Sequence, residues 1–289
     1  MEPANNAVYL HYDQAALDRA YDQRAWAANA DAMLDRFRIL GEAALLAAPD
    51  LMVSAYGQGA DETLDVFPTT AGPAIHVHIH GGGWRNQSKR DAAFLATAGC
   101  AAGLHTVVPD FSQLPGVKLP EMVDQLARAV GWVWRNAASF GGDPARIILS
   151  GHSSGAHLAA VLLTLDWTAH NLPAGVIKAA ILVSGIYDME PVMLSARRTY
   201  IVLEDGEAER LSPIRHTGLI GCPVTLLHGS GESVDFTRQT LAFDAALASA
   251  GVQVRTVLIP NVNHYEINEG FAMSDSPVFQ ALLSARDGL

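Results

Sequence analysis

The sequence is poor in the residues that mark several classes of protein. Its 289 residues include only two cysteines, Cys100 and Cys222, too few for a disulfide framework or a cysteine-based metal site. Charged residues make up 17% of the chain, and acidic residues exceed basic ones to give a net charge of −11. Without a cluster of lysine or arginine, this balance argues against a nucleic-acid-binding surface.

Long apolar runs are also missing. No stretch approaches the roughly 20 apolar residues that a membrane-spanning helix needs, and the first residues lack a basic segment followed by an apolar one. The sequence has no internal repeat, low-complexity tract or linker-like stretch. Hydrophobic residues make up 49% of the chain, which is enough for a large core. We therefore expect a cytoplasmic protein without membrane or nucleic-acid partners, folded as a single domain over residues 1–289.

Short apolar runs of strand length alternate with helical stretches along most of the chain. The expected strands are 51–56, 63–67, 74–80, 105–109, 146–150, 178–184, 223–228 and 252–259. The expected helices between or after them are 88–102, 121–138, 237–250 and 276–286. A glycine-containing turn joins the first two strands into an antiparallel hairpin. The pattern predicts an α/β protein with a mostly parallel sheet of about eight strands and helices on both faces.

Two regions fall outside this alternation. Residues 11–47 are helical in composition and contain no proline, and they form either a solvated surface helix or a small cap over a site. Residues 185–220 are irregular and contain prolines, and we expect an insertion near the site. In a parallel sheet the ligand crevice lies beyond the C-terminal ends of the strands. The chemically interesting residues of this sequence follow those ends.

The stretch 151–155 reads Gly-His-Ser-Ser-Gly and lies between a predicted strand and an apolar helical stretch. This context is typical of a nucleophile elbow, in which Ser153 occupies a sharp, strained turn and its hydroxyl stands above the sheet edge. Glycine on both flanks avoids a clash in that turn. Taken alone, the pentapeptide is also compatible with an ordinary glycine turn.

A serine nucleophile needs a base, and the base needs a carboxylate to orient it. In this arrangement the three follow successive strands in the order nucleophile, acid, base. His264 follows the last strand and is the only histidine after the expected acid loop, so it is the candidate base. The acid loop contains both Glu232 and Asp235, and the pattern alone leaves the two open.

The stretch 80–84, His-Gly-Gly-Gly-Trp, follows the predicted strand 74–80. Acyl transfer requires amide donors aimed at a developing oxyanion, and bare glycine backbone can approach it closely. The amides of Gly82, Gly83 and Ser154 are therefore candidates for an oxyanion hole. A flexible loop without this role is the alternative.

Aromatic residues beside these motifs are candidates for the walls of a substrate pocket. They are Trp84 after the glycine loop, Tyr187 after the strand 178–184, and Tyr265 after the candidate base. Ordinary packing in the core is the alternative for each. The expected partner is a small-molecule ester or amide.

Other histidines suggest a different chemistry. His76, His78 and His80 alternate along one strand, so their side chains share a face, which resembles part of a zinc site. No carboxylate motif of a metallohydrolase accompanies them, and we expect them to be buried, hydrogen-bonded or, for His80, to brace the glycine loop. His152 and His157 adjoin the elbow and are expected to support it. A metallohydrolase and a non-catalytic binding protein stay as alternatives, although a binding protein would typically lack one of the three catalytic positions.

The sequence resembles α/β-hydrolases of the hormone-sensitive-lipase-like branch and is most like the kynurenine formamidase (arylformamidase) and carboxylesterase group. The matching stretches cover most of the chain and are specific for hydrolases. They lie at 17–21 (Leu-Asp-x-x-Tyr), 80–84, 140–146 (Phe-Gly-Gly-Asp-Pro-x-Arg), 151–158, 184–188 (Ser-Gly-Ile-Tyr-Asp), 211–213 (Leu-Ser-Pro) and 235–239 (Asp-Phe-x-Arg-Gln).

This resemblance implies an α/β-hydrolase fold and a serine hydrolase that works through an acyl-enzyme. The implied substrate is a small ester, an aryl amide or a formamide such as N-formylkynurenine, with a general short-chain carboxylesterase as the alternative. The acid position falls on Glu232, where many relatives carry aspartate. Gly83 stands where formamidases often have tyrosine, so we expect a roomier acyl pocket. No metal or other cofactor is implied, and the resemblance is compatible with a homodimer.

Overall fold

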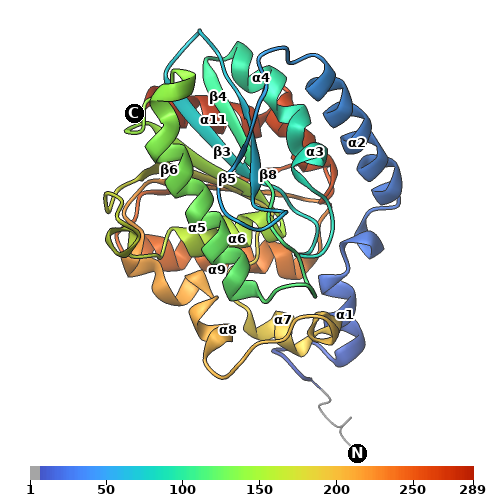
Figure 1. The fold of residues 1–289 in the computed structure, drawn as a ribbon. Helices are drawn as coiled ribbons and strands as arrows, with labels where there is room; N and C mark the ends of the chain where they lie inside the picture. Colours follow the sequence, from blue (N-terminus) through green and yellow to red (C-terminus); the bar gives the residue numbers. More distant parts are fainter. Residues whose placement is uncertain (1–6) are drawn as a thin grey trace, which may run out of the picture.

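The computed structural model describes residues 7–289 and contains an eight-stranded sheet (Figure 1). The strands lie in the order β1-β2-β4-β3-β5-β6-β7-β8. Their bounds are β1 (Met52–Ala55), β2 (Thr63–Phe67), β3 (Ala74–Ile79), β4 (Leu104–Pro109), β5 (Ile147–His152), β6 (Ile177–Val183), β7 (Val224–Gly229) and β8 (Val254–Ile259). β1 and β2 pair antiparallel and β2 pairs antiparallel with β4, whereas the other pairs are parallel, which confirms the predicted sheet. Residues 1–6, on which the expected lack of a signal peptide rests, lie outside the described range.

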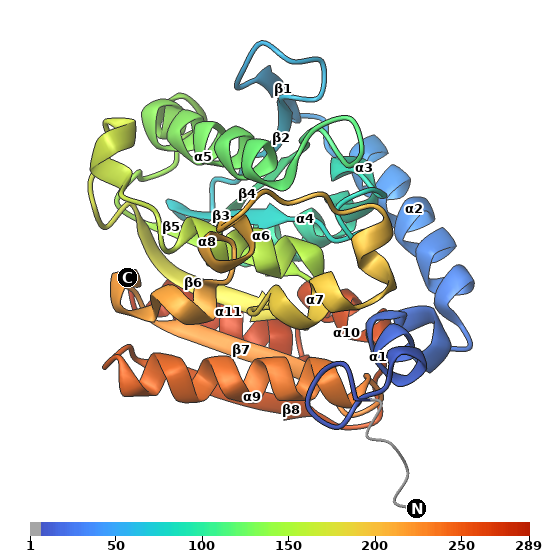
Figure 2. The ribbon, with the colours of Figure 1, turned by 90° about the horizontal axis from the view of Figure 1, so that it is seen from below.

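Helices cover both faces of this sheet (Figures 1 and 2). The helices are α1 (Gln14–Tyr21), α2 (Ala30–Leu46), α3 (Lys89–Ala92), α4 (Ala96–Ala101), α5 (Leu119–Asn136), α6 (Ser154–Leu162), α7 (Glu190–Leu194), α8 (Glu207–Arg210), α9 (Val234–Ser249), α10 (Glu266–Glu269) and α11 (Pro277–Asp287). α5, α6 and α9 pack on one face, and α4 and α11 pack on the other.

Neighbouring residues of the central strands point to opposite faces. Ile148 and Ile181 belong to the core under α4 and α11, whereas Leu149 and Leu182 belong to the core under α5 and α6. All four side chains are at most 1% exposed. A parallel strand that is covered on both sides must be apolar at every position, which is why these strands read as continuous hydrophobic runs.

The predicted helix 88–102 is wrong as a single element. It divides into α3, a 3₁₀ turn (Ala93–Leu95) and α4. All three residues of the turn are buried.

The helical segment 11–47 also divides. α1 and a following 3₁₀ turn, η1 (Gln23–Trp26), lie beside α9, α7 and the 3₁₀ turn η5 (Ala196–Thr199), near the C-terminal ends of the strands (Figure 2). α2 instead packs against α3 on the outside of the molecule. The first part of the segment therefore reaches the region expected for a cap over a site, and α2 adds Leu34 to the lining of the cavity described below.

The predicted insertion 185–220 contains α7, η5, α8 and a final 3₁₀ stretch (Pro213–Leu219), which follow β6 at its C-terminal end. Short helices joined by turns explain the irregular sequence pattern. Among residues 7–289, no helix combines the length and the apolar character that crossing a membrane requires.

Candidate active site

Ser153 occupies the sharp turn between β5 and α6, with φ 55° and ψ −122°. This left-handed backbone is strained for a residue with a side chain, and the close packing around it holds it in place. A Cβ at Gly151 would overlap the carbonyl of Gly155, and a Cβ at Gly155 would overlap the carbonyl of Ile79. The geometry therefore requires glycine at both flanks, as the elbow pattern predicts.

His264 lies between Ser153 and Glu232. Its Nε2 is 2.8 Å from Ser153 Oγ, and its Nδ1 is 3.0 Å from Glu232 Oε2. An ionised carboxylate can only accept, so Nδ1 carries the proton and Nε2 is free to accept the serine hydroxyl proton. The exposed fractions are 6% for Ser153, 3% for His264 and 5% for Glu232, so bulk water competes little for these contacts.

The second oxygen of Glu232 is fixed by neutral donors. Oε1 accepts the Ser184 hydroxyl and the Gly229 amide, each at 2.6 Å. These contacts aim Oε2 at His264 and fix the tautomer of the imidazole. The sequence analysis missed Ser184, although it stands at the end of β6 in one of the motifs that carry the resemblance.

Asp235, the second candidate acid, belongs to a different network. Its carboxylate is fully buried and accepts Arg238 Nε at 2.6 Å. It also accepts the hydroxyl of Tyr21 from α1, and Gln239 Nε2 donates to that same hydroxyl at 2.8 Å. The geometry therefore places Glu232, and not Asp235, against the histidine.

The glycine loop lies beside Ser153. Gly82 and Gly83 both have positive φ, at 108° and 64°, and both line the pocket described below. Trp84 N donates to Ser154 Oγ at 3.2 Å, which joins the loop to the elbow. In the described part of the chain, the amides of Gly82, Gly83 and Ser154 donate to no other protein atom. These amides are thus available to a ligand, and Ser154 is the first residue of α6, where amides lack intrahelical partners.

His76 and His78 share one partner, with ring nitrogens 2.6 and 2.8 Å from Ser150 Oγ. Burial lowers the pKa of His76 to about 3, so its ring is neutral. His80 instead stacks on Phe111 with ring centroids 4.4 Å apart, and its Nδ1 lies 2.9 Å from the carbonyl of the loop glycine at 81. Within residues 7–289 no group of three His, Cys, Asp or Glu side chains is arranged to hold a metal. The three histidines fit the predicted packing and bracing roles.

His152 and His157 form hydrogen bonds to segments that pack around the elbow, which is consistent with the supporting role predicted for them. His152 Nε2 donates to the backbone carbonyl of His264 at 2.7 Å, which holds the loop that carries the candidate base. His157 Nδ1 accepts Trp84 Nε1 at 3.2 Å, and its Nε2 donates to the carbonyl of Leu211 at 2.8 Å. Burial lowers the pKa of His157 to about 4, consistent with this neutral donor–acceptor arrangement.

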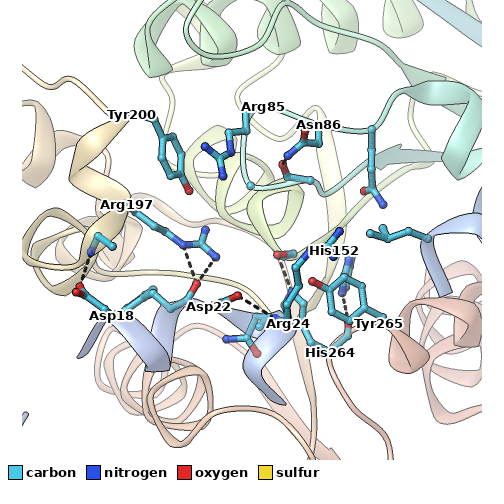
Figure 3. Close-up of a pocket in the computed structure, with 18 of the residues that line it drawn as sticks. Asp18, Asp22, Arg24, Arg85, Asn86, His152, Arg197, Tyr200, His264 and Tyr265 are labelled. Carbon is cyan, nitrogen blue, oxygen red and sulfur yellow. Dashed lines mark hydrogen bonds between the residues drawn. The ribbon is translucent and has the colours of Figure 1, made fainter. Parts of the chain in front are cut away.

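A cavity of about 650 Å³ opens above Ser153. Its walls come from the glycine loop, from α1 and η1, from η5 and from the loop after β8 (Figure 3). The lining residues include Asp18, Tyr21, Asp22, Arg24, Gly82, Gly83, Arg85, Asn86, Asp91, His152, Ser153, Arg197, Tyr200, His264 and Tyr265. Much of this wall is polar or charged, and the N-terminal segment contributes a substantial part of it.

Of the three predicted aromatic walls, only Tyr265 lines this cavity. The predictions for Trp84 and Tyr187 are wrong, because their side chains are 1% and 0% exposed. Trp84 turns into the core beneath the loop, where it bonds to the imidazole of His157, and Tyr187 stacks on Phe243 at 4.2 Å. Both are large apolar surfaces that gain more from burial in the core than from a solvent-filled pocket.

Known proteins share both the sequence pattern and the fold. Residues 76–268 match the family described as the alpha/beta hydrolase fold. The kynurenine formamidase of Danio rerio is 33% identical over 227 residues, which cover 76% of this chain and 76% of that protein. The kynurenine formamidase of Salmo salar is 31% identical over 246 residues, covering 82% of each. An esterase from the archaeon Pyrobaculum calidifontis superposes with a TM-score of 0.74 over 89% of this chain and 92% of its own, at 19% identity. The chain therefore belongs to the α/β-hydrolase fold family.

Proposed function

We propose that this hydrolase cleaves a small ester or aryl amide by nucleophilic catalysis at Ser153. The observation that supports it is the continuous hydrogen-bonded series from Ser153 through His264 to Glu232 at the floor of a cavity. His264 Nε2 removes the hydroxyl proton while Ser153 Oγ attacks the carbonyl carbon. Glu232 stabilises the imidazolium that forms.

The tetrahedral oxyanion binds to the amides of Gly82, Gly83 and Ser154. Removing one such donor typically costs about 10²–10³-fold in rate, because the donors are oriented before the charge develops. His264 then gives its proton to the leaving oxygen or nitrogen, and the acyl group remains on Ser153. Water, activated by the same imidazole, attacks the acyl-enzyme and releases the acid. Each step uses side chains and amides of this chain, and no cofactor takes part.

The substrate class we propose is an aryl formamide or a related aryl amide, with N-formylkynurenine as the natural type. The support comes from the two fish kynurenine formamidases, which are similar over three quarters or more of the chain. Cytoplasmic location and a homodimeric state stay predictions.

A short-chain carboxylesterase is the second candidate, and one observation favours it. A Cβ at Gly83 would meet nothing closer than 3.9 Å, so the loop leaves room beside the reacting carbon for an acyl group larger than formyl.

Turnover of a substrate panel separates the two candidates. We would compare N-formylkynurenine, p-nitrophenyl formate, acetate and butyrate, and a simple aliphatic amide. The formamidase proposal requires N-formylkynurenine to have the highest kcat/KM. A preference for acetate and butyrate esters, with negligible formamide cleavage, would replace it with the carboxylesterase. Hydrolysis of none of them would contradict both.

A further inference from the structure

Two guanidinium groups line one side of the cavity, opposite His264 and Tyr265 (Figure 3). Arg85 follows the glycine loop and Arg197 lies in η5. Within residues 7–289, neither forms an ion pair with a carboxylate, although the whole chain carries a net charge of −11. Positive charge without a carboxylate partner inside a cavity indicates a site for an anionic group.

The guanidinium of Arg197 is held in one orientation. Its Nε and Nη2 both donate to the backbone carbonyl of Tyr21, at 3.0 and 2.8 Å. Nη1 is buried and has no hydrogen-bond partner in the described residues. A Cβ built on Gly83 would lie 3.9 Å from Nη1, so this nitrogen is next to the glycine loop beside Ser153. Buried donors are normally paired, and an unpaired one at a cavity wall points to a missing acceptor.

Aromatic rings fix the positions of both cations. The Arg197 guanidinium lies 5.5 Å from the ring of Trp84, and that of Arg85 lies 4.0 Å from the ring of Tyr200. The Tyr200 hydroxyl is also 3.9 Å from the Cβ position of Gly83, which adds a donor to the same wall. A cation placed over a ring keeps its charge and its remaining N–H groups available to a third partner.

The carboxylates that line the cavity are bound to other groups. Asp18 accepts the Ala196 amide at 2.6 Å, Asp22 accepts the Arg24 amide at 3.1 Å, and Asp91 accepts the Ser88 hydroxyl at 2.9 Å. They do not neutralise the two guanidiniums by direct contact.

We propose that Arg197, together with Arg85 at the rim, binds a carboxylate carried by the substrate and makes the enzyme selective for anionic esters or amides. This inference rests on the proposed hydrolase function for its substrates. Guanidinium binds carboxylate through charge-assisted hydrogen bonds, and Nη1 is the donor already in place. The bound anion would lie beside Gly83, close to the scissile carbonyl, so it contributes to substrate positioning.

The test compares substrates that differ only in the charge of one group. 3-Acetoxybenzoate is paired with its methyl ester, and the mono-4-nitrophenyl ester of glutaric acid is paired with 4-nitrophenyl valerate. In at least one pair the wild-type enzyme should prefer the anion by kcat/KM. That preference should fall about 10-fold or more in Arg197→Gln and less in Arg85→Gln, because a hydrogen bond between charged groups is lost.

The neutral member of each pair distinguishes a loss of carboxylate binding from a general distortion of the cavity. Arg197 also supports the Tyr21 carbonyl, so Arg197→Gln could disturb the cavity and slow both members of a pair equally. The side chain of Arg85 makes no hydrogen bond within the described residues, so Arg85→Gln is expected to leave the fold intact. Arg198→Gln is the matched control, since Arg198 is exposed and lies outside the cavity lining. An unchanged charge preference in both Arg197→Gln and Arg85→Gln would overturn the proposal.

Binding without turnover gives a separate measurement. In Ser153→Ala, calorimetric titration should show benzoate binding more tightly than benzamide, and the additional change Arg197→Gln should remove the difference. Equal affinities in Ser153→Ala would contradict the carboxylate site even if every ester is cleaved. Conversely, selective benzoate binding in a wild-type protein that cleaves no substrate would retain this site and reject the hydrolase mechanism.

Discussion

Glu232 and Asp235 are buried carboxylates three residues apart in the sequence, and they belong to networks of different kinds. Glu232 accepts a hydroxyl, an amide and the Nδ1–H of His264, all of them neutral groups. Asp235 accepts a guanidinium and a phenol, so its charge is already balanced by Arg238. The first network can stabilise a new cation, whereas the second already contains one.

This difference indicates how one loop supports two roles. Glu232 precedes the N-cap of α9 and turns toward the strand ends, while Asp235 lies in the first turn of the helix and faces α1. When Ser153 loses its proton, only a carboxylate without a permanent cation gains strong stabilisation from the imidazolium. We therefore propose that the network of Glu232 takes part in catalysis. The network of Asp235 joins the N-terminal segment, and with it one wall of the cavity, to the rest of the fold.

Ser153→Ala is expected to cause the largest loss of turnover in the network that contains Glu232. Losing the nucleophile should lower kcat by about 10⁴-fold or more, since catalysis by a triad depends on all its members acting together. The melting temperature should stay near wild type, because the substitution removes only one side-chain hydrogen bond, the one to His264. Steady-state kinetics and thermal unfolding of the purified variant check both. Near-wild-type turnover in folded protein would reject the serine-hydrolase mechanism.

Glu232→Gln should give the next largest loss. The neutral amide cannot stabilise the imidazolium and can hold the wrong tautomer of His264, which should cost about 10²–10⁴-fold in kcat/KM. The neutral donors around Oε1 can bond to the amide oxygen as well, so the fold should hold, and circular dichroism and the melting temperature serve as controls. An active Glu232→Gln would mean that this carboxylate does not orient the base.

Asp235→Asn should disrupt the other network and lower stability more than turnover, the reverse of what is expected for Glu232→Gln. It leaves Arg238 without its counter-ion and weakens the contact to Tyr21, which should cost about 1–3 kcal/mol of unfolding free energy. Its kcat/KM should stay within a few-fold of wild type when the protein is folded. Denaturant unfolding and kinetics measured on one preparation check this. A large loss of turnover at full stability would show that the two roles are exchanged.

Tyr21→Phe should have the smallest effect. It removes the hydrogen bond donated to Asp235 and the one accepted from Gln239, and it keeps the ring, so the expected loss is about 1–2 kcal/mol in unfolding free energy. Because the N-terminal segment lines the cavity, KM should rise more than kcat falls. Equal stability of variant and wild type would show that this contact does not anchor α1. Tyr56→Phe is a suitable control, since Tyr56 bonds to the carbonyl of Asp110 in another part of the fold.

Much of the fold could be predicted because its signals are local. The apolar runs of buried parallel strands and the glycine pattern around Ser153 depend on residues that are neighbours in the sequence. His264 is the predicted base because it is the only histidine after the acid loop. The choice between Glu232 and Asp235 could not be made from the loop pattern alone, because it depends on which way each side chain leaves one turn. The resemblance selected Glu232, and the geometry agrees.

The rest depends on tertiary contacts. Trp84 and Tyr187 adjoin the right motifs, but whether an aromatic side chain faces a cavity or the core is set by the elements packed on it. Ser184 reaches Glu232 across 48 positions of sequence, which no local pattern indicates. Arg197 lies in an irregular segment, where the sequence does not indicate that its side chain lines the cavity.

Covalent labelling tests the central claim, that Ser153 is the nucleophile, most directly. The wild-type protein would be treated with a fluorophosphonate, digested and analysed by mass spectrometry, with residual activity followed in parallel. We predict one adduct per chain, on the peptide that contains Ser153, with activity lost in proportion to labelling. Ser153→Ala should take up no label. Full activity in labelled protein, or an adduct that forms equally in Ser153→Ala, would contradict the account.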